Sequence, residues 1–355
     1  MVFGHGAWGP RTVDAGARPG QPAVPQIRSV ALRPATDFLR RIGAPVDDLL
    51  ERAHIHPWVA RNEEALVPVP ALNRFLDEAA RVEAIGDLGV QVGLEASISK
   101  LGPLGRAVTC APTLHEALQT AYRILPRHSS GERAWCTVEG EEAHLHHRWC
   151  VGPDRAYSHA AAIVFFLHLD LLRSAAGPGF RPLRVDLQAE PSAAYRRPEA
   201  LGDTPIRFGR EMTTITVPTR LLSLAMPRPA AATSPADWRE DGPATDFAGS
   251  MQQVVAGLLP AGHPDLPLVA RIVGLSVRTA QRRLARAGTT YARVVAAARF
   301  DLAQRMFADP RRKIIEVALD LGYSDAAHFT RAFRRWTSTT PRAFRRQRRQ
   351  SPHPS

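Results

Sequence analysis

Residues 268–284 read LVARIVGLSVRTAQRRL, and residues 315–333 read IEVALDLGYSDAAHFTRAF. In each stretch an alanine (Ala270 or Ala318) precedes a glycine (Gly274 or Gly322) by four residues, and an apolar residue and a serine follow. The alanine lets two helices approach closely, the glycine relieves the turn after the first helix, and the serine caps the second. The pattern therefore predicts a helix-turn-helix unit that occurs twice.

Each predicted second helix has an apolar face and a basic face. Ala280 and Leu284 would point inward in the first copy, and Phe329 and Phe333 in the second. The outer faces carry polar side chains, most of them arginine. In the first copy these are Arg278, Gln281, Arg282 and Arg286, and in the second copy His328, Arg331, Arg334 and Arg335. Arginine pairs with guanine and neutralises phosphate, and glutamine pairs with adenine. Because the turn and the basic face occur twice, the sequence favours a DNA-reading function for these helices over the alternative that their charged faces are only exposed to solvent.

The distribution of charge supports a polyanionic partner for the C-terminal third. The 355-residue chain has a formal net charge of +12. Residues 247–355 hold 19 Lys and Arg against 6 Asp and Glu, whereas the preceding residues hold 27 against 28. A basic surface of this kind is expected of a nucleic-acid-binding module, although an anionic membrane would attract it too.

The composition indicates a cytoplasmic protein with no membrane partner. The three cysteines, Cys110, Cys136 and Cys150, are too few and of odd number for a disulfide framework. No secretion signal is visible at the N-terminus. The longest apolar stretch, 160–172, is interrupted by His168 and is shorter than the roughly 20 residues of a membrane span.

Composition and periodicity predict an α+β N-terminal domain joined to a helical C-terminal domain. The predicted segments are a disordered tail (1–26), an N-terminal domain (27–227), a linker (228–246), a DNA-binding domain (247–346) and a basic, disordered tail (347–355). The N-terminal domain should contain helices at 33–52 (interrupted near 43–45), 70–85, 113–125 and 156–176, a hairpin of strands 134–138 and 143–149, and short strands at 183–187 and 213–217.

A single amphipathic helix is expected between the two turn units, over 290–308. Val294, Ala298, Leu302 and Met306 recur there at four-residue intervals. Its length would be roughly 28 Å at 1.5 Å per residue. A rod of that length can hold two recognition helices near one DNA turn apart, about 34 Å, so that one chain reaches two successive major-groove segments.

The C-terminal residues resemble the DNA-binding domain of the AraC/XylS family of bacterial transcription regulators. The run GYSDAAHFTRAFRRWTSTTPRAFR (322–345) is similar to the family signature, and 274–291 resembles its upstream half. The resemblance covers 264–346 and implies a seven-helix, all-α domain. Two positions depart from the family: Ser338 stands where glycine is usual, and Ala280 where leucine is usual.

The resemblance also implies residue roles. It assigns base contacts to Arg278, Gln281 and Arg282 in the first recognition helix, and to Ala327, His328, Thr330 and Arg331 in the second. Phosphate contacts are expected from Ser276, Arg286, Ser324, Arg334 and Arg335. Double-stranded DNA is the implied partner, with RNA polymerase as a further one.

The N-terminal region resembles the arabinose-binding-like sensor domain found in a subset of the same family. The resemblance is carried by LGVQVG (88–93), LGPLGRAVTCAPTLHEAL (101–118) and TPIRFG (204–209). It implies effector sensing or dimerisation, and hence a homodimer, without identifying the effector. The apolar run Ile163–Phe166 is interpreted as core or dimer interface, with the lining of an effector pocket as the alternative.

The predicted hairpin raises two further hypotheses. His144, His146 and His147, with Cys136 and Cys150, invite a metal site, and His144 and His146 would share one face of their strand. A redox switch between Cys136 and Cys150 is the other, if the hairpin brings both ends together. An exposed, hydrogen-bonded hairpin is favoured over both, so no cofactor or metal is predicted.

The leading hypothesis is a sequence-specific transcription regulator, more often an activator in the family it resembles, that responds to a small molecule. No phosphate-binding loop or catalytic elbow is present around 101–105 or 128–130, so an enzyme is not expected. The rivals are an architectural DNA-binding protein without an effector and, less favoured, an enzyme fused to a DNA-binding module.

Overall fold

The computed structural model of the chain describes residues 6–8, 22–150, 158–197, 199–227, 242–259, 262, 264–307, 309 and 311–350. It divides into two units: Met1–Arg18 with Pro25–Pro243, and Pro19–Val24 with Ala244–Ser355. Most of the predicted N-terminal tail and residues 228–241 of the predicted linker lie outside the described residues.

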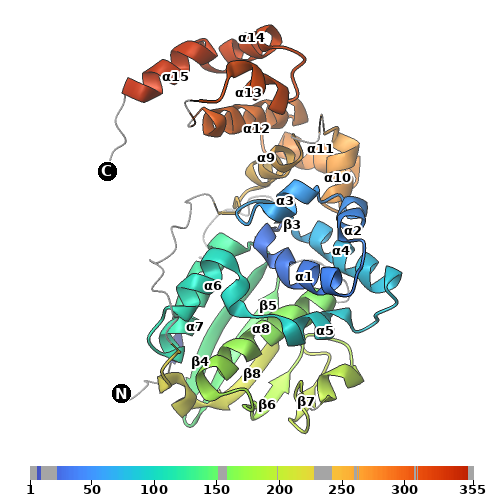
Figure 1. Cartoon of the computed structure of the whole chain (residues 1–355), viewed down its shortest axis with the longest axis vertical. Coiled ribbons are helices and arrows are strands. Elements are labelled where there is room, and N and C mark those ends of the chain that lie inside the picture. The colour runs from blue at the N-terminus through green and yellow to red at the C-terminus, as the bar shows by residue number, and fades with distance from the viewer. Residues whose placement is uncertain are drawn as a thin grey trace. The chain divides into compact units, whose positions relative to one another are not determined.

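The first unit is built on a mixed, six-stranded sheet in the order β1-β4-β5-β8-β6-β7 (Figure 1). Its strands are β1 (Gly6–Trp8), β4 (Glu132–Glu139), β5 (Glu142–Trp149), β6 (Arg184–Asp186), β7 (Ile206–Arg207) and β8 (Thr213–Pro218). The predicted hairpin is confirmed, because β4 and β5 pair antiparallel from Glu139↔Glu142 to Glu132↔Trp149. Gly140 makes the turn with a φ of 60°, which suits a residue without a Cβ.

The helices of the first unit follow the predicted periodicity, and α7 and α8 lie against one face of the sheet (Figure 1). Its α-helices are α1 (Arg33–Arg41), α2 (Val46–Arg52), α3 (Pro57–Arg61), α4 (Val69–Val82), α5 (Leu88–Glu95), α6 (Gly102–Thr109), α7 (Leu114–His128) and α8 (Ser158–Ala176). A two-stranded sheet pairs β2 (Gln26–Arg28) with β3 (Leu66–Pro68). The predicted interruption falls between α1 and α2, at Gly43 with a φ of 82°. The capping box at the start of α7 is present, with Thr113 and Glu116 bonded reciprocally.

Two glycines of the LGVQVG stretch allow α5 and α8 to pack closely. A Cβ on Gly89 would lie 2.5 Å from the backbone of His159, and one on Gly93 would lie 2.6 Å from the ring of Phe166. Close packing against α8 thus explains why the LGVQVG stretch has glycine at positions 89 and 93. Helix α8 is also the one described helix long and apolar enough to span a membrane, with a mean hydropathy of 1.3. It packs against α4, α5 and α7 as a core helix instead.

Seven helices make up the described part of the second unit, as the family resemblance implied. They are α9 (Phe247–Leu258), α10 (Leu266–Ile272), α11 (Val277–Arg286), α12 (Tyr291–Met306), α13 (Ile314–Asp320), α14 (Ala326–Thr337) and α15 (Pro341–Gln350). The α+β and all-α fold classes are therefore confirmed.

Three boundaries differ from the sequence-based prediction. Residues 22–26, placed in the tail, belong to the fold: the buried Val24 donates a hydrogen bond to the Ser250 hydroxyl, and Gln26 opens β2. Helix α15 continues to Gln350 beyond the predicted domain end at 346, because 341–350 contains no glycine and no second proline. Helix α4, predicted to run to residue 85, ends at Val82, which is 39% exposed.

Candidate nucleic-acid interface

The first turn unit joins α10 and α11. Asp265 caps α10 by accepting a hydrogen bond from the Leu268 amide, and Ala270 is buried where the two helices meet. Gly274 has a φ of 72°, and the Leu275 amide donates 2.8 Å to the Ala270 carbonyl. This left-handed glycine with a bond spanning five residues is a Schellman ending, as the sequence pattern predicted.

The second turn unit, between α13 and α14, repeats that geometry. Gly322 has a φ of 79°, and the Tyr323 amide donates 2.9 Å to the carbonyl of Ala318, which is fully buried. The two alanines and two glycines thus occupy equivalent places. The duplication inferred from sequence is confirmed at the level of backbone geometry.

The caps of the two second helices differ. Ser276 caps α11, and its hydroxyl accepts a hydrogen bond from the Thr279 amide at 3.2 Å. In the second copy Ser324, which we expected to cap, lies one residue too early. Asp325 is the cap of α14 and accepts from the amides of Ala327 (2.8 Å) and His328 (2.7 Å). The bond to the His328 amide is the main reason that the pKa of Asp325 lies below its ordinary value.

Helix α11 presents the predicted polar face. Ala280 and Leu284 are buried, at 0% and 1% exposure. The predicted base-reading residues of this helix are exposed, namely Arg278, Gln281 and Arg282, and so is Arg286. An exposed row of long donors beside a buried apolar row is the arrangement that groove insertion requires.

Helix α14 has the same division, with Phe329 and Phe333 fully buried. Of the residues predicted to face DNA, Ser324, Ala327, His328, Arg331, Arg334 and Arg335 are exposed. Thr330 is half-buried, and its hydroxyl donates 2.7 Å to the Ala326 carbonyl. The Thr330 hydroxyl proton is therefore used in a bond to its own helix. Only the oxygen lone pair and the methyl group of Thr330 are left to contact a DNA base.

A basic hollow lies beside α14. Its lining consists of Gly322, Tyr323, Ser324, His328, Arg331, Arg334 and Arg335. Here the structure brings together base-reading and phosphate-contacting residues predicted separately. The Ser324 hydroxyl lies 3.0 Å from His328 Nδ1, and an Asp325 carboxylate oxygen lies 3.2 Å from the same nitrogen. These contacts orient the imidazole at the first turn of the helix.

Helix α12 connects the two turn units and contributes to both cores. Thr290 caps it, and its 16 residues span about 24 Å at 1.5 Å per residue, somewhat shorter than predicted. Val294 and Ala298 are buried, whereas Leu302 and Met306 are partly buried. Helix α12 packs against α9 at one place and α14 at another.

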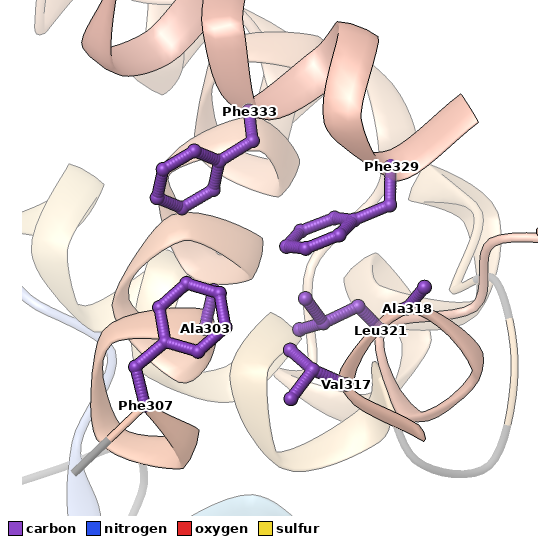
Figure 2. Close-up of a cluster of buried hydrophobic side chains, with 7 residues drawn as sticks. All are labelled: Ala303, Phe307, Val317, Ala318, Leu321, Phe329 and Phe333. Atoms are coloured by element: carbon purple, nitrogen blue, oxygen red, sulfur yellow. The ribbon is translucent and has the colours of Figure 1, made fainter. Parts of the chain in front are cut away.

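The core of the second turn unit is aromatic and tightly interleaved (Figure 2). Its buried members are Ala303, Phe307, Val317, Ala318, Leu321, Phe329 and Phe333. The rings of Phe307 and Phe333 meet edge to face with centroids 5.6 Å apart. Burying a phenylalanine contributes roughly 1.5–3 kcal/mol, so this cluster fixes α14 on α12 and α13.

Sequence reasoning missed two arginines that stabilise this region by stacking, and the exposed basic face of α15. The Arg299 guanidinium lies 5.1 Å from the Tyr323 ring, and that of Arg345 lies 4.8 Å from the Phe307 ring. Arg342 and Arg346 are exposed on α15. Composition and, for Arg342 and Arg345, the family signature pointed to arginines here, but neither can separate a stacked arginine from a solvated one.

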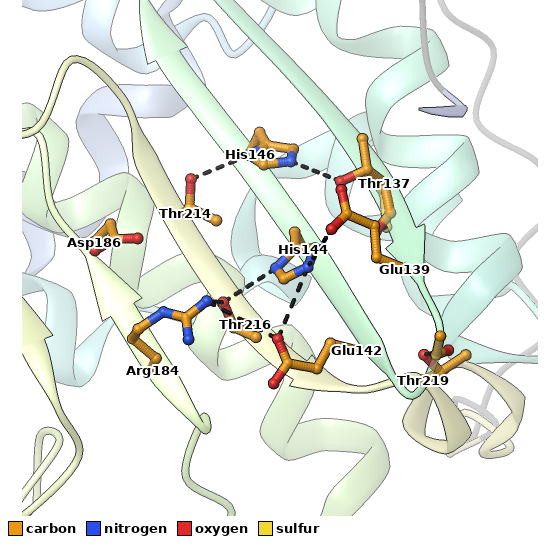
Figure 3. A network of polar contacts seen from close by, with 12 residues as sticks. Thr137, Glu139, Glu142, His144, His146, Arg184, Asp186, Thr214, Thr216 and Thr219 are labelled. Carbon is orange, nitrogen blue, oxygen red and sulfur yellow. Dashed lines mark hydrogen bonds and ion pairs between the residues drawn. The ribbon is translucent and has the colours of Figure 1, made fainter. Parts of the chain in front are cut away.

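The hairpin histidines divide between the two faces of the sheet. His144 and His146 share the face away from α7 and α8, as predicted, and bond to the hydroxyls of Thr216 and Thr214 at 3.2 and 3.0 Å (Figure 3). His147 points to the opposite face and bonds to Glu132. The described residues contain no metal-competent cluster of histidine, cysteine and carboxylate, so the metal hypothesis is not supported.

The cysteine switch is also wrong on geometry. Cys136 pairs with Leu145 and is fully buried, whereas the Cys150 amide bonds to the Gly131 carbonyl. Five residues of strand separate Cys136 from Gly131, about 17 Å, and a disulfide requires about 4.4–6.8 Å between Cα atoms. Burial also raises the pKa of the Cys136 thiol to about 12, which makes it unreactive.

The apolar run on α8 lines an internal cavity in part. Ile163 and Val164 face the cavity. Phe165 and Phe166 instead pack on Tyr195, with ring centroids 6.0 and 5.9 Å away. One half of the run therefore lines a cavity, and the other half packs in the core.

Comparison with known proteins gives the same division of the chain. Residues 43–226 match the arabinose-binding domain of AraC transcription regulators, and 269–347 match a helix-turn-helix domain family. The HTH-type transcriptional regulator VirS of Mycobacterium tuberculosis is 28% identical over 346 residues, covering 90% of this chain and 96% of VirS. The ornithine utilization regulator of Pseudomonas aeruginosa is 26% identical over 322 residues, covering 87% of this chain and 93% of its own.

A solved structure is also similar along most of its length. The transcriptional regulator CdpR from Pseudomonas aeruginosa is 22% identical and covers 89% of this chain and 98% of its own, with a TM-score of 0.37. That score is too low to add weight, and the assignment rests on the two domain matches and the full-length relatives. The chain belongs to the AraC family of DNA-binding transcription regulators, with an N-terminal domain of the arabinose-binding type.

Proposed function

We propose that the protein reads one operator by placing α11 and α14 in two successive major-groove segments. The observation that carries the proposal is the duplicated Schellman turn, followed each time by an exposed basic helix within one unit. The base-reading set is Arg278, Gln281 and Arg282 with Ala327, His328, Thr330 and Arg331. The phosphate set is Ser276, Arg286, Ser324, Arg334 and Arg335, whose contacts fix register and carry no sequence information.

We further propose that a small effector bound by the first unit changes promoter occupancy. For effector binding to change DNA binding, the effector must bind the conformation that binds DNA with a different affinity from the conformation that does not. An internal cavity in the first unit supports this role. Homodimerisation through the same unit and contact with RNA polymerase complete the proposal, which places the protein in the cytoplasm and assigns it no catalysis.

The affinity ratio between operator and bulk DNA tests this function. Genome-wide mapping of sites bound by the full chain supplies the operator, and titration against that site and random duplex gives the ratio. A regulator should prefer its site by about 10³ or more at physiological salt. A ratio near one would show an architectural protein instead and overturn the proposal.

A further inference from the structure

The first unit encloses a cavity of about 100 Å³ between the sheet and helices α4, α7 and α8. Most of its wall is aliphatic, from residues such as Leu72, Leu118, Ile163, Leu167 and Leu171. For comparison, an apolar cavity of about 150 Å³ in an engineered protein stays dry and binds benzene. The cavity in the first unit is smaller than that one, so it would hold at most a small ring or a short chain.

One end of the cavity is polar. Glu132 and His147 line it and are bonded at 2.7 Å, and both are buried. Burial opposes ionisation of Glu132, but the hydrogen bond and charge of His147 outweigh it, so the pKa of this carboxyl lies below its ordinary value. The carboxylate is therefore charged at neutral pH and already has a partner.

Two further histidines at this end are neutral at pH 7. Burial lowers the pKa of His168 and of His128 to about 4. The His168 Nδ1–H donates 2.9 Å to the Val164 carbonyl, so its other ring nitrogen carries a lone pair. His128 is 4% exposed, and its Nδ1 has no hydrogen-bond partner among the described residues.

We propose that this cavity binds a small, uncharged, mainly apolar molecule whose single hydroxyl group bonds to the imidazoles at the polar end. The inference rests on the proposed effector role and specifies the class of ligand. A buried nitrogen left without a partner costs about 1–3 kcal/mol, which a ligand hydroxyl would recover. A hydroxyl donates one hydrogen bond and accepts others, so it can donate to the unprotonated nitrogen of His168 while it accepts from His128, provided that His128 carries its proton on Nδ1.

The charge of the polar end excludes ionic head groups. A carboxylate would lose its hydration in the apolar wall, and the buried Glu132 carboxylate, although bonded to His147, would repel it. An ammonium group would lose its hydration and find Glu132 already bonded to His147. Neutral ligands avoid both costs.

Calorimetric titration of the full chain at pH 7.5 tests this selectivity. The probes are phenol, benzoate and benzylamine, and then 1-hexanol, hexanoate and hexylamine. We expect the hydroxyl compound of at least one trio to bind about tenfold or more tightly than both charged analogues. Tighter or equal binding of a charged analogue would overturn the proposal, and so would no binding of either hydroxyl compound.

Matched variants locate the site. His128→Phe should weaken binding of the preferred hydroxyl compound by about three- to tenfold, the worth of one hydrogen bond, and leave toluene unaffected. The control is His146→Phe, because His146 also has a pKa of about 4 but lies on the opposite sheet face. Unchanged affinity in His128→Phe with native toluene binding would contradict the assignment of the polar end.

Operator binding measured without ligand separates this inference from the proposed function. A chain that selects DNA but takes up no hydroxyl compound refutes the ligand class alone. A chain that binds the hydroxyl compound but selects no DNA refutes the proposed function and leaves the cavity assignment standing.

Discussion

Ser338 ends α14 with a φ of 59° and a ψ of 5°, in the left-handed region. The family resemblance implied a glycine at this position. The Cβ of a non-glycine residue is crowded against the backbone there, at a cost of roughly 1–2 kcal/mol. The departure noted from sequence is therefore a conformational cost at the helix end and does not concern DNA chemistry.

Ser338→Gly should stabilise the second unit by about 0.5–1 kcal/mol, because relief of the left-handed cost exceeds the extra entropy that glycine gives the unfolded chain. Urea unfolding of the full chain, followed by far-UV circular dichroism, measures the change. Ser338→Ala is the control, because alanine keeps the Cβ. Equal stability of the glycine and alanine variants would contradict this account.

Among the elements, α14 depends most on its first turn, where Asp325 binds two backbone amides. Removing such a cap costs about 1 kcal/mol. Asp325→Ala should therefore destabilise the second unit by about that amount, as measured by the midpoint of urea unfolding. Ser324→Ala should cost less than half as much, since its hydroxyl bonds to side chains. If Ser324→Ala lowered the stability of the second unit more than Asp325→Ala does, Ser324 and not Asp325 would be the cap of α14.

The same element shows how far local sequence determines structure. Glycine spacing and apolar periodicity predicted both turns, because they depend on backbone sterics within a few residues. They did not choose between Ser324 and Asp325, since both are good capping residues and the choice depends on where the turn ends. Likewise Val82 fitted the apolar period of α4, but the helix ends at that residue and leaves it 39% exposed.

At the scale of the whole molecule, sequence reasoning suggested one stretch of the cavity wall, the apolar run 163–166, but could not predict the polar end of the cavity. Its polar end joins His128 from the end of α7, Glu132 from β4, His147 from β5 and His168 from α8. No local sequence pattern links these residues. His146 and His147 are consecutive in β5 and point to opposite faces of the sheet, so only the register of the strand decides which of them faces the cavity. Long-range packing decides such sites, whereas the DNA-facing helices are short, contiguous segments.

The buried histidines make the stability of the first unit depend on pH. The ordinary pKa of histidine is 6.5, and burial lowers it to about 4 in His128 and His168. Between those values the unfolded chain binds more protons than the native one, so stability is full above pH 6.5 and falls as the pH drops toward 4.

Urea unfolding of the full chain at a series of pH values measures this dependence. For each unit by which the pH falls within the window, the unfolding constant should rise up to about 1,000-fold, because His128, His168 and also His146, whose pKa is about 4 as well, each take up a proton on unfolding. A His128→Phe, His168→Phe double variant should lose most of that slope. A flat profile in the native chain would show that both imidazoles are charged or solvated when folded.

The central claim is that α11 and α14 read two separate segments of one DNA site. Selection of binding sites from random duplexes by the full chain tests it most directly, with Arg282→Ala and Arg331→Ala as variants. We predict two blocks of base preference about one helical turn (10–10.5 base pairs) apart, and a loss of about 1–3 kcal/mol confined to a different block in each variant. A single block, or a loss spread evenly over all positions in both variants, would contradict the account.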